Sequence, residues 1–283
     1  MLGEILSIGA ALMWATSTVS SAKALEEVDP LTVNALKTLF SSVLMLFIAL
    51  ISTANQGLPN LNTYGLSLVI IAAIIGYGIG DTCLFKSLTL IGVSRSYTIG
   101  YSYPLFVMVF AALFLTEPLL PKNLLGTIIV ILGIVLASSS KDAKGQGNSI
   151  GLLFALAASL LWAIGTIFVA IGLRDVDVIM ANTFRYPLLF LFLFSVSRPW
   201  NRKRNMSGRN LSLIALSGVL GMVLGGISFL LGVQLAGVSK ATSLSSSSPV
   251  WASLMSSLFL KEKFSWKIVL SSVIVVIGIY FLT

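Results

Sequence analysis

The chain has 283 residues, of which 57% are hydrophobic and only 10% are charged. Soluble domains carry about 25% charged residues, so this composition excludes a water-facing globular protein and indicates a membrane protein. One cysteine and no histidine exclude a disulfide framework and a Cys- or His-based metal site, and the excess of 18 Lys and Arg over 10 Asp and Glu reflects membrane orientation more simply than nucleic-acid binding.

Apolar segments that are long enough to cross a bilayer follow one another along the whole chain, separated by turn or charged residues. No basic stretch precedes the first segment, which we therefore interpret as a membrane span and not as a cleaved signal. We predict an all-α integral membrane protein with ten transmembrane helices. The ten segments are Leu2–Lys23, Leu31–Ser52, Tyr64–Ser87, Val93–Leu115, Lys122–Ser139, Ser149–Gly172, Val178–Val196, Leu211–Gly232, Val238–Leu260 and Trp266–Leu282.

The second half of the chain repeats the first. Because each half has five spans, an odd number, the second half must enter the membrane from the opposite face. We predict two inverted repeats, residues 1–145 and 146–283, an architecture found in many secondary transporters. The matched pairs are Trp14 with Trp162, Asn34 with Asn182, Lys37 with Arg185, Gly76 with Gly221, Gly80 with Gly225, Pro104 with Pro249, and Gly133 with Gly278.

Two segments, Gly92–Glu117 and Gly237–Glu262, are the clearest twins. Each begins with Gly-Val-Ser and a basic residue, carries an internal proline and ends at a glutamate, so we expect an apolar helix with a proline inside it. Tyr97 and Tyr101 are four residues apart and share one face of the first helix, whereas Ser246 stands opposite Tyr101 in the second. If these faces line a cavity, one wall is aromatic and the other presents hydroxyls; plain helix packing by small serines is the alternative.

Three charged residues lie deep inside predicted spans, away from the first and last few residues of each. Asp81 is the only carboxylate among them, and Lys37 lies at a similar depth, so the two form either a structural ion pair or part of a proton-coupling site. Arg185 corresponds to Lys37, but the counterpart of Asp81 is Gly226, so Arg185 has no intramembrane carboxylate at its level. Its guanidinium either reaches lipid headgroups or helix carbonyls, or it meets a substrate carboxylate or phosphate.

Trp14 and Trp162 lie near the middle of their spans, where an indole N–H needs a partner. They are either packed core residues or walls of a cavity. The small-xxx-small glycine pairs and the two prolines predict close helix crossings or hinges: Gly76, Gly80, Gly221, Gly225, Pro104 and Pro249. The candidate cavity-lining residues are Trp14, Ser17, Tyr77, Tyr97, Tyr101, Trp162, Thr166, Arg185, Ser245 and Ser246.

These residues resemble the EamA family of the drug/metabolite transporter superfamily over essentially the whole chain. The resemblance rests on the central tryptophans, on Lys37 and Arg185, and on the Gly-Val-Ser, proline and Leu-x-Glu pattern of the twin segments. It implies ten helices around a central cavity and export or exchange of small molecules, often amino acids. Small four-helix relatives use a glutamate in the first span for protons; here that region holds Trp14 and no acid.

Membrane orientation is left with two interpretations. Thirteen basic residues lie on the face opposite the N-terminus and three on its own face, which by the positive-inside rule places both termini outside. The family resemblance places both termini in the cytoplasm instead.

The leading function is an alternating-access transporter of small polar metabolites in the cell membrane, with amino acids as the first class, acting as a monomer or weak dimer without cofactor or metal. The alternatives are a lipid or lipid-linked phosphate flippase and a non-transporting membrane scaffold. The sequence contains no recognisable nucleophile–base arrangement, so we do not expect an enzyme.

Overall fold

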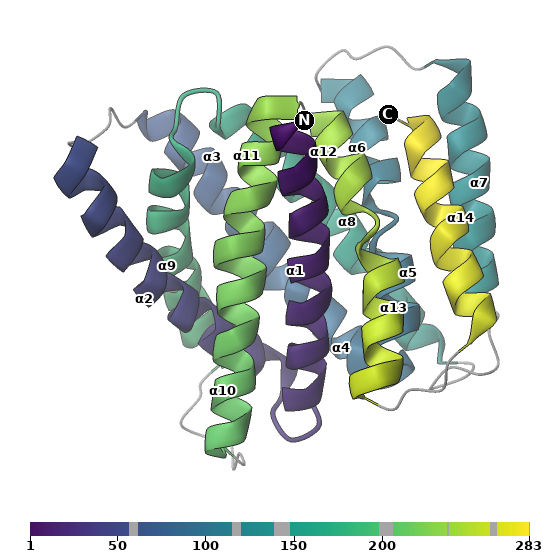
Figure 1. Cartoon of the computed structure of the whole chain (residues 1–283), viewed down its shortest axis with the longest axis horizontal. Coiled ribbons are helices and arrows are strands. Elements are labelled where there is room, and N and C mark those ends of the chain that lie inside the picture. The colour runs from purple at the N-terminus through teal and green to yellow at the C-terminus, as the bar shows by residue number, and fades with distance from the viewer. Residues whose placement is uncertain are drawn as a thin grey trace.

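The computed structural model describes residues 1–56, 62–114, 120–138, 148–197, 206–236, 238–260 and 265–282, and within these ranges every regular element is a helix (Figure 1). Both ends of the chain lie at the same edge of the bundle (Figure 1). The elements are α1 (Leu2–Ala24), α2 (Pro30–Gln56), α3 (Thr63–Ala73), η1 (Ile74–Gly80), α4 (Asp81–Ile91), α5 (Val93–Gly100), α6 (Tyr103–Phe114), α7 (Pro121–Ser138), α8 (Ser149–Gly172), α9 (Val178–Ser197), α10 (Gly208–Ser217), η3 (Gly218–Gly225), α11 (Gly226–Ala236), α12 (Val238–Ser245), α13 (Ser248–Phe259) and α14 (Trp266–Leu282).

Seven helical runs in the described residues are long and apolar enough to cross a membrane. Helix α14 is apolar but shorter. The structure therefore establishes an all-helical membrane protein, while the full count of ten spans stays a prediction. The seven runs are Leu2–Ala24, Pro30–Ala54, Thr63–Ile91, Val93–Phe114, Ser149–Gly172, Val178–Ser197 and Gly208–Ala236.

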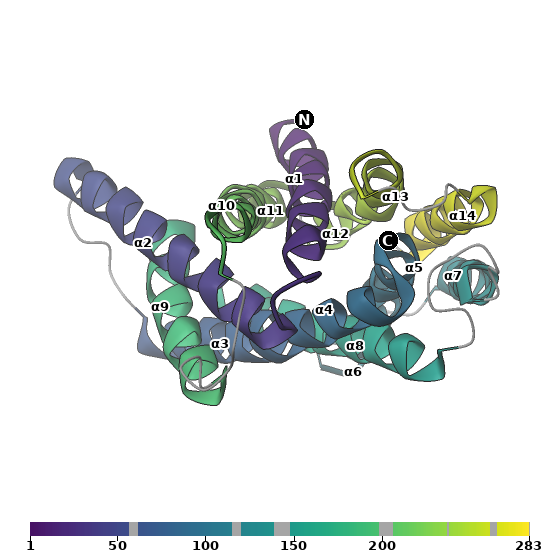
Figure 2. The ribbon, with the colours of Figure 1, turned by 90° about the horizontal axis from the view of Figure 1, so that it is seen from below.

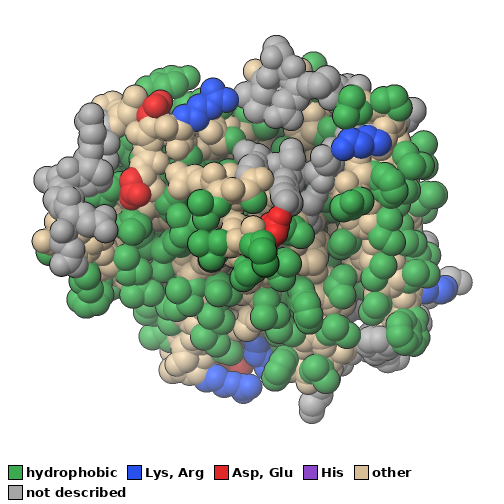
Figure 3. Space-filling view, turned by 45° about the horizontal axis from the view of Figure 1, so that its top comes forward, with side chains coloured by type: hydrophobic (Ala, Val, Ile, Leu, Met, Phe, Trp, Pro, Cys, Tyr) green, Lys and Arg blue, Asp and Glu red, His purple; other side chains and the backbone are tan. Residues whose placement is uncertain are grey.

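The distribution of side chains is that of a protein in a bilayer. Large hydrophobic residues such as Leu50, Phe47 and Leu258 are exposed, and hydrophobic side chains cover most of the face in Figure 3. The buried residues include many that are polar, among them Asn34 and Ser41. Lipid accepts the apolar exterior, and the polar interior is available for function.

Helix starts and turns follow local chemistry. The side chains of Asn62, Asn148 and Ser207 accept hydrogen bonds from the first-turn N–H groups of α3, α8 and α10. These caps satisfy donors that the helix itself leaves unpaired. Between α4 and α5 the chain turns sharply at Gly92, whose φ of 81° lies in the region that favours glycine.

The first helix of each half packs on the other half of the chain. Helix α1 contacts α10, η3, α11, α12 and α13, whereas α8 contacts α3, η1, α4, α5 and α6 (Figure 2). Helix α2 pairs with α9, and α7 pairs with α14. The centre of the bundle is therefore built from both halves together.

Among the described elements, η1 and η3 have wide π-helical turns. A π turn leaves backbone carbonyls available to other groups, and here side chains from neighbouring helices use them. Asn34 Nδ2 donates to the carbonyls of Tyr77 (2.6 Å) and Gly78 (3.1 Å) in η1. Trp14 Nε1 donates to the carbonyl of Gly221 in η3 at 3.0 Å. The π turns thus anchor residues at the centre of the bundle.

One prediction about the twin segments is wrong. The prolines do not lie inside continuous helices: the chain breaks at Tyr101–Ser102 and at Ser246–Ser247, and Pro104 and Pro249 each stand in the first turn of the next helix. Proline has no N–H to donate and is tolerated in a first turn, where that donor would be unpaired in any case. The glutamates predicted to end these segments lie outside the described residues.

Candidate functional site

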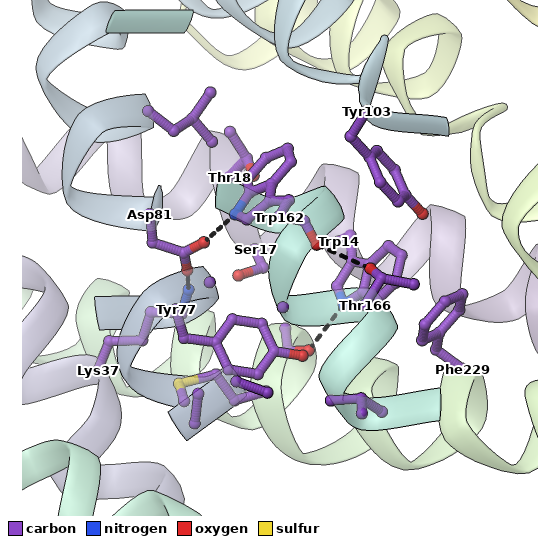
Figure 4. A pocket seen from close by; sticks show the side chains of 18 of the residues that line it. Trp14, Ser17, Thr18, Lys37, Tyr77, Asp81, Tyr103, Trp162, Thr166 and Phe229 are labelled. Carbon is purple, nitrogen blue, oxygen red and sulfur yellow. Dashed lines mark hydrogen bonds and ion pairs between the residues drawn. The ribbon is translucent and has the colours of Figure 1, made fainter. Parts of the chain in front are cut away.

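A cavity of about 120 Å3 lies at the centre of the bundle, bounded by residues from α1 to α6 and from α8, α9, η3 and α11 (Figure 4). A cavity needs at least about 10–15 Å3 to hold one water, so this one is large enough for several waters or a small ligand. Its lining is Trp14, Ser17, Thr18, Lys37, Ala72, Ala73, Gly76, Tyr77, Asp81, Leu84, Phe85, Tyr97, Tyr101, Tyr103, Trp162, Gly165, Thr166, Val169, Arg185, Gly221, Met222, Phe229 and Leu230.

A buried ion pair forms one side of this cavity. Lys37 Nζ lies 2.7 Å from Asp81 Oδ2, and both side chains are buried. The other carboxylate oxygen, Oδ1, accepts a hydrogen bond from Trp162 Nε1 at 3.0 Å (Figure 4). Lys37 Nζ also stands 5.2 Å from the centre of the Phe85 ring. Asp81 therefore uses both oxygens within the protein.

A second cation, Arg185, occupies a different environment in the same cavity. Its guanidinium Nη2 donates to the hydroxyl of Tyr186 at 3.2 Å, and Cζ lies 5.2 Å and 5.0 Å from the ring centres of Tyr77 and Tyr186. Tyr186 in turn donates to the carbonyl of Met222 at 2.6 Å. Within the described residues, no carboxylate lies at ion-pair distance from Arg185. Aromatic faces stabilise this cation, which has no anion beside it.

Aromatic rings form a further wall. Tyr101 makes edge contacts with Trp14 and Trp162, at ring-centre distances of 6.5 Å and 5.6 Å, and Tyr103 makes another with Trp162 at 6.1 Å. Tyr97 stacks beside Tyr101 at 4.6 Å and donates its hydroxyl proton to the carbonyl of Trp14 at 3.1 Å. The resulting surface is apolar in its faces and polar at a few fixed hydroxyls.

The two central tryptophans are held in related ways. A methyl group placed on Gly225 would meet Trp14 Cδ1 at 2.9 Å, and one placed on Gly80 would meet Trp162 Cδ1 at 3.0 Å. Each indole therefore packs against a glycine at the end of the π turn from the opposite half. Their N–H partners differ, since Trp14 donates to a backbone carbonyl and Trp162 to the Asp81 carboxylate.

Eight of the ten predicted lining residues line this cavity, and the serine wall does not. Ser245 and Ser246 are buried, but both hydroxyls donate to the carbonyl of Thr242 in their own segment. Gly76 and Gly221 are part of the lining, whereas the other predicted hinge residues, Gly80, Gly225, Pro104 and Pro249, are not.

Several residues of the site were not predicted. Tyr103 is the third tyrosine before Pro104, after Tyr97 and Tyr101, so the sequence pattern could have identified it. Tyr186 could not be found by comparing the two halves, because the corresponding residue in the first half is Thr38. Phe229 packs on Trp14 with ring centres 5.0 Å apart. In the part of the chain that the structure describes, no group of three Cys, Asp or Glu side chains is arranged to hold a metal ion.

Comparison with known proteins identifies the class. The model of the EamA-like transporter family matches residues 1–139 and 149–283. The chain belongs to the EamA-like transporter family. This result confirms the resemblance seen in the sequence and makes the chain a multi-pass transporter of the cell membrane.

Two individual proteins extend the comparison. An "Uncharacterized transporter" of Archaeoglobus fulgidus is 26% identical over 285 residues, covering 100% of this chain and 98% of its own. A protein of known crystal structure matches 99% of this chain and 96% of its own, with a TM-score of 0.70 at 16% identity. At that identity the solved structure supports the fold alone, and neither relative names a substrate.

Proposed function

We propose that this EamA-like transporter is an alternating-access secondary transporter of small polar metabolites, with amino acids as the first class to test. The observation that carries the proposal is the central cavity, whose lining brings together a buried ion pair, an aromatic wall and a cation that has no anion beside it among the described residues. Sites of this kind combine apolar faces with a few fixed polar groups that orient a ligand. A cavity of about 120 Å3 admits a small ligand, so compact molecules such as amino acids are the first candidates.

Two inverted five-helix repeats, residues 1–145 and 146–283, are part of the proposal. The family model matches one segment in each half. Helices α1 and α8 make reciprocal contacts with the opposite halves, and η1 and η3 fall at equivalent places in them. In the α7–α14 pair, a methyl on Gly133 would meet Val275 and a methyl on Gly278 would meet Val130, which is the reciprocity expected of a two-fold axis. Both chain ends lie at one edge, as an even number of spans requires (Figure 1).

Such an arrangement supports rocking of the halves about the cavity. Each π turn borders the cavity and contacts a tryptophan of the other half, through Gly221 for Trp14 and through Gly80 for Trp162. A change in either π turn would therefore reach the cavity wall directly. Asp81 is engaged on both oxygens in this conformation, which favours a structural ion pair over a freely exchanging proton site.

The test is exchange in proteoliposomes. Purified transporter is reconstituted with an unlabelled amino acid inside, and entry of the labelled compound is followed for a panel of amino acids. Saturable counterflow of at least one compound, absent from protein-free vesicles, is the expected result. Absence of saturable flux for every compound, with folded protein demonstrated in the vesicles, would refute the proposal. Headgroup-dependent scrambling of labelled lipid in the same vesicles would favour a flippase instead.

A further inference from the structure

We infer that Arg185, held by Tyr77 and Tyr186, is a carboxylate subsite, and that the transporter recognises its substrates by the carboxylate and not by the ammonium group. This inference rests on the proposed function and specifies the substrate class at the same cavity. It applies to compact monocarboxylates, with or without an amino group.

The first observation is an uncompensated buried cation. Arg185 is 1% exposed and lines the cavity, yet its guanidinium hydrogen-bonds the neutral hydroxyl of Tyr186 and pairs with no carboxylate among the described residues. Its Nε has no hydrogen-bond partner among the described residues. A guanidinium has five donors in a planar fork that matches a carboxylate, and a buried charge needs pairing. A carboxylate that enters the cavity would supply the missing acceptors.

The second observation is an asymmetry between the halves. Lys37, the counterpart of Arg185, is neutralised by Asp81. At the counterpart of Asp81 stands Gly226, and a methyl placed there would meet the hydroxyl of Tyr186 at 2.8 Å. A tyrosine hydroxyl thus fills the space beside Gly226, next to the second cation. Lys37, Asp81 and Arg185 together leave the cavity with one net positive charge.

Tyr77 and Tyr186 act as positioning residues for the guanidinium. The Tyr186 hydroxyl is fixed at both sides, since it accepts from Arg185 and donates to the carbonyl of Met222 at 2.6 Å. The ring centres of Tyr77 and Tyr186 lie at nearly the same distance from Arg185 Cζ, 5.2 Å and 5.0 Å. A guanidinium held in this way loses little freedom when it binds a carboxylate.

The third observation concerns the amino group. Asp81 is the one carboxylate among the described lining residues, and its oxygens are already used by Lys37 and Trp162. A substrate ammonium would therefore meet aromatic faces and no acidic partner. The same faces accept an apolar body, so removal of the amino group removes no dedicated contact.

The experiment compares matched sets of three compounds: alanine, propionate and ethylamine; leucine, 4-methylpentanoate and 3-methylbutylamine; phenylalanine, 3-phenylpropionate and phenethylamine. Binding to purified transporter is measured by ligand-dependent thermal stabilisation, and inhibition of exchange is measured in proteoliposomes. In at least one set, we expect the two carboxylates to bind within about threefold of each other. The amine of that set should bind roughly ten- to a hundredfold more weakly, as expected for loss of a charged hydrogen-bonded contact.

Arg185→Gln should lower carboxylate affinity by roughly the same ten- to a hundredfold and remove the discrimination against the amine. Arg174→Gln is the matched control, because it removes an equal charge from an exposed position that does not line the cavity. Tyr186→Phe keeps the charge and removes the hydroxyl that orients it, so an intermediate loss is expected. Should Arg185→Gln fail to fold, the comparison of compounds on the unaltered protein decides alone.

Three results would overturn the inference. They are binding of amines as tight as that of the matched carboxylates, strict dependence on the amino group, and no binding of any carboxylate. If amines or uncharged compounds are still exchanged, the transporter function stands and only the carboxylate subsite is lost. If no compound of any class is exchanged, the proposed function fails as well.

Discussion

The buried Lys37–Asp81 pair gives the sharpest test of the cavity's energetics. The two charged atoms are 2.7 Å apart, and Asp81 carries a second contact from Trp162. At an effective dielectric constant near 20, the Coulomb attraction at that distance is roughly 6 kcal/mol, from which the desolvation of both groups must be subtracted. Removing one partner leaves the other charge buried and unpaired, at a cost of about 3–5 kcal/mol.

A double-mutant cycle separates the pair from its surroundings. Lys37→Met and Asp81→Asn should each destabilise the protein strongly, whereas the double variant keeps the net charge and leaves no unpaired ion. We expect the double variant to recover most of the loss, with a coupling energy of at least about 2 kcal/mol. The assay is the midpoint of denaturant unfolding in a fixed detergent. Single variants as stable as the parent, or losses that simply add in the double variant, would refute the reasoning.

Two further predictions compare matched positions of the halves, and each is read by the same unfolding midpoint. Gly221→Ala should destabilise the protein by about 1–3 kcal/mol because its new methyl would overlap Ser17. Gly76→Ala should be nearly neutral because no described atom lies within 4 Å of its methyl, and equal midpoints for the two variants would contradict this. Asn34→Ala should cost about 1–3 kcal/mol because Nδ2 bonds two carbonyls and a hydroxyl of another segment. Asn182→Ala should cost less, since among the described residues that amide donates only to a carbonyl of its own helix, and the reverse order would contradict the packing.

Much of the fold was predictable because membrane spans have a strong local signal. The seven apolar runs coincide with predicted segments, and the pairing of Lys37 with Asp81 was accessible from helix rise alone. Trp14 and Trp162 were recognisable as unusual because they lie near the middle of their spans, whereas tryptophans of membrane proteins are enriched at the membrane surface. Composition and the spacing of matched residues were therefore enough to predict the positions of the helices and most of the residues that line the cavity.

The remaining features depend on tertiary contacts that a single sequence does not show. The π turns exist where Asn34 and Trp14 take up their carbonyls, and neither partner is near them in the sequence. The serine wall failed as a cavity wall because a serine hydroxyl can bond a carbonyl in its own segment, as Ser246 does. Tyr186 was missed because its role depends on standing beside Gly226, far away along the chain.

The most direct test of the account is the accessibility of the cavity from the two sides of the membrane. Thr166 lines the cavity, and its hydroxyl bonds only a carbonyl of its own helix in the part of the chain that the structure describes. Thr166→Cys in a Cys83→Ala background therefore introduces a thiol with little disturbance. A membrane-impermeant thiol reagent should label this cysteine from either side of oriented vesicles. An exchanged substrate should slow the labelling from both sides. Labelling from one side only, under every condition and with folded protein, would contradict alternating access at this cavity.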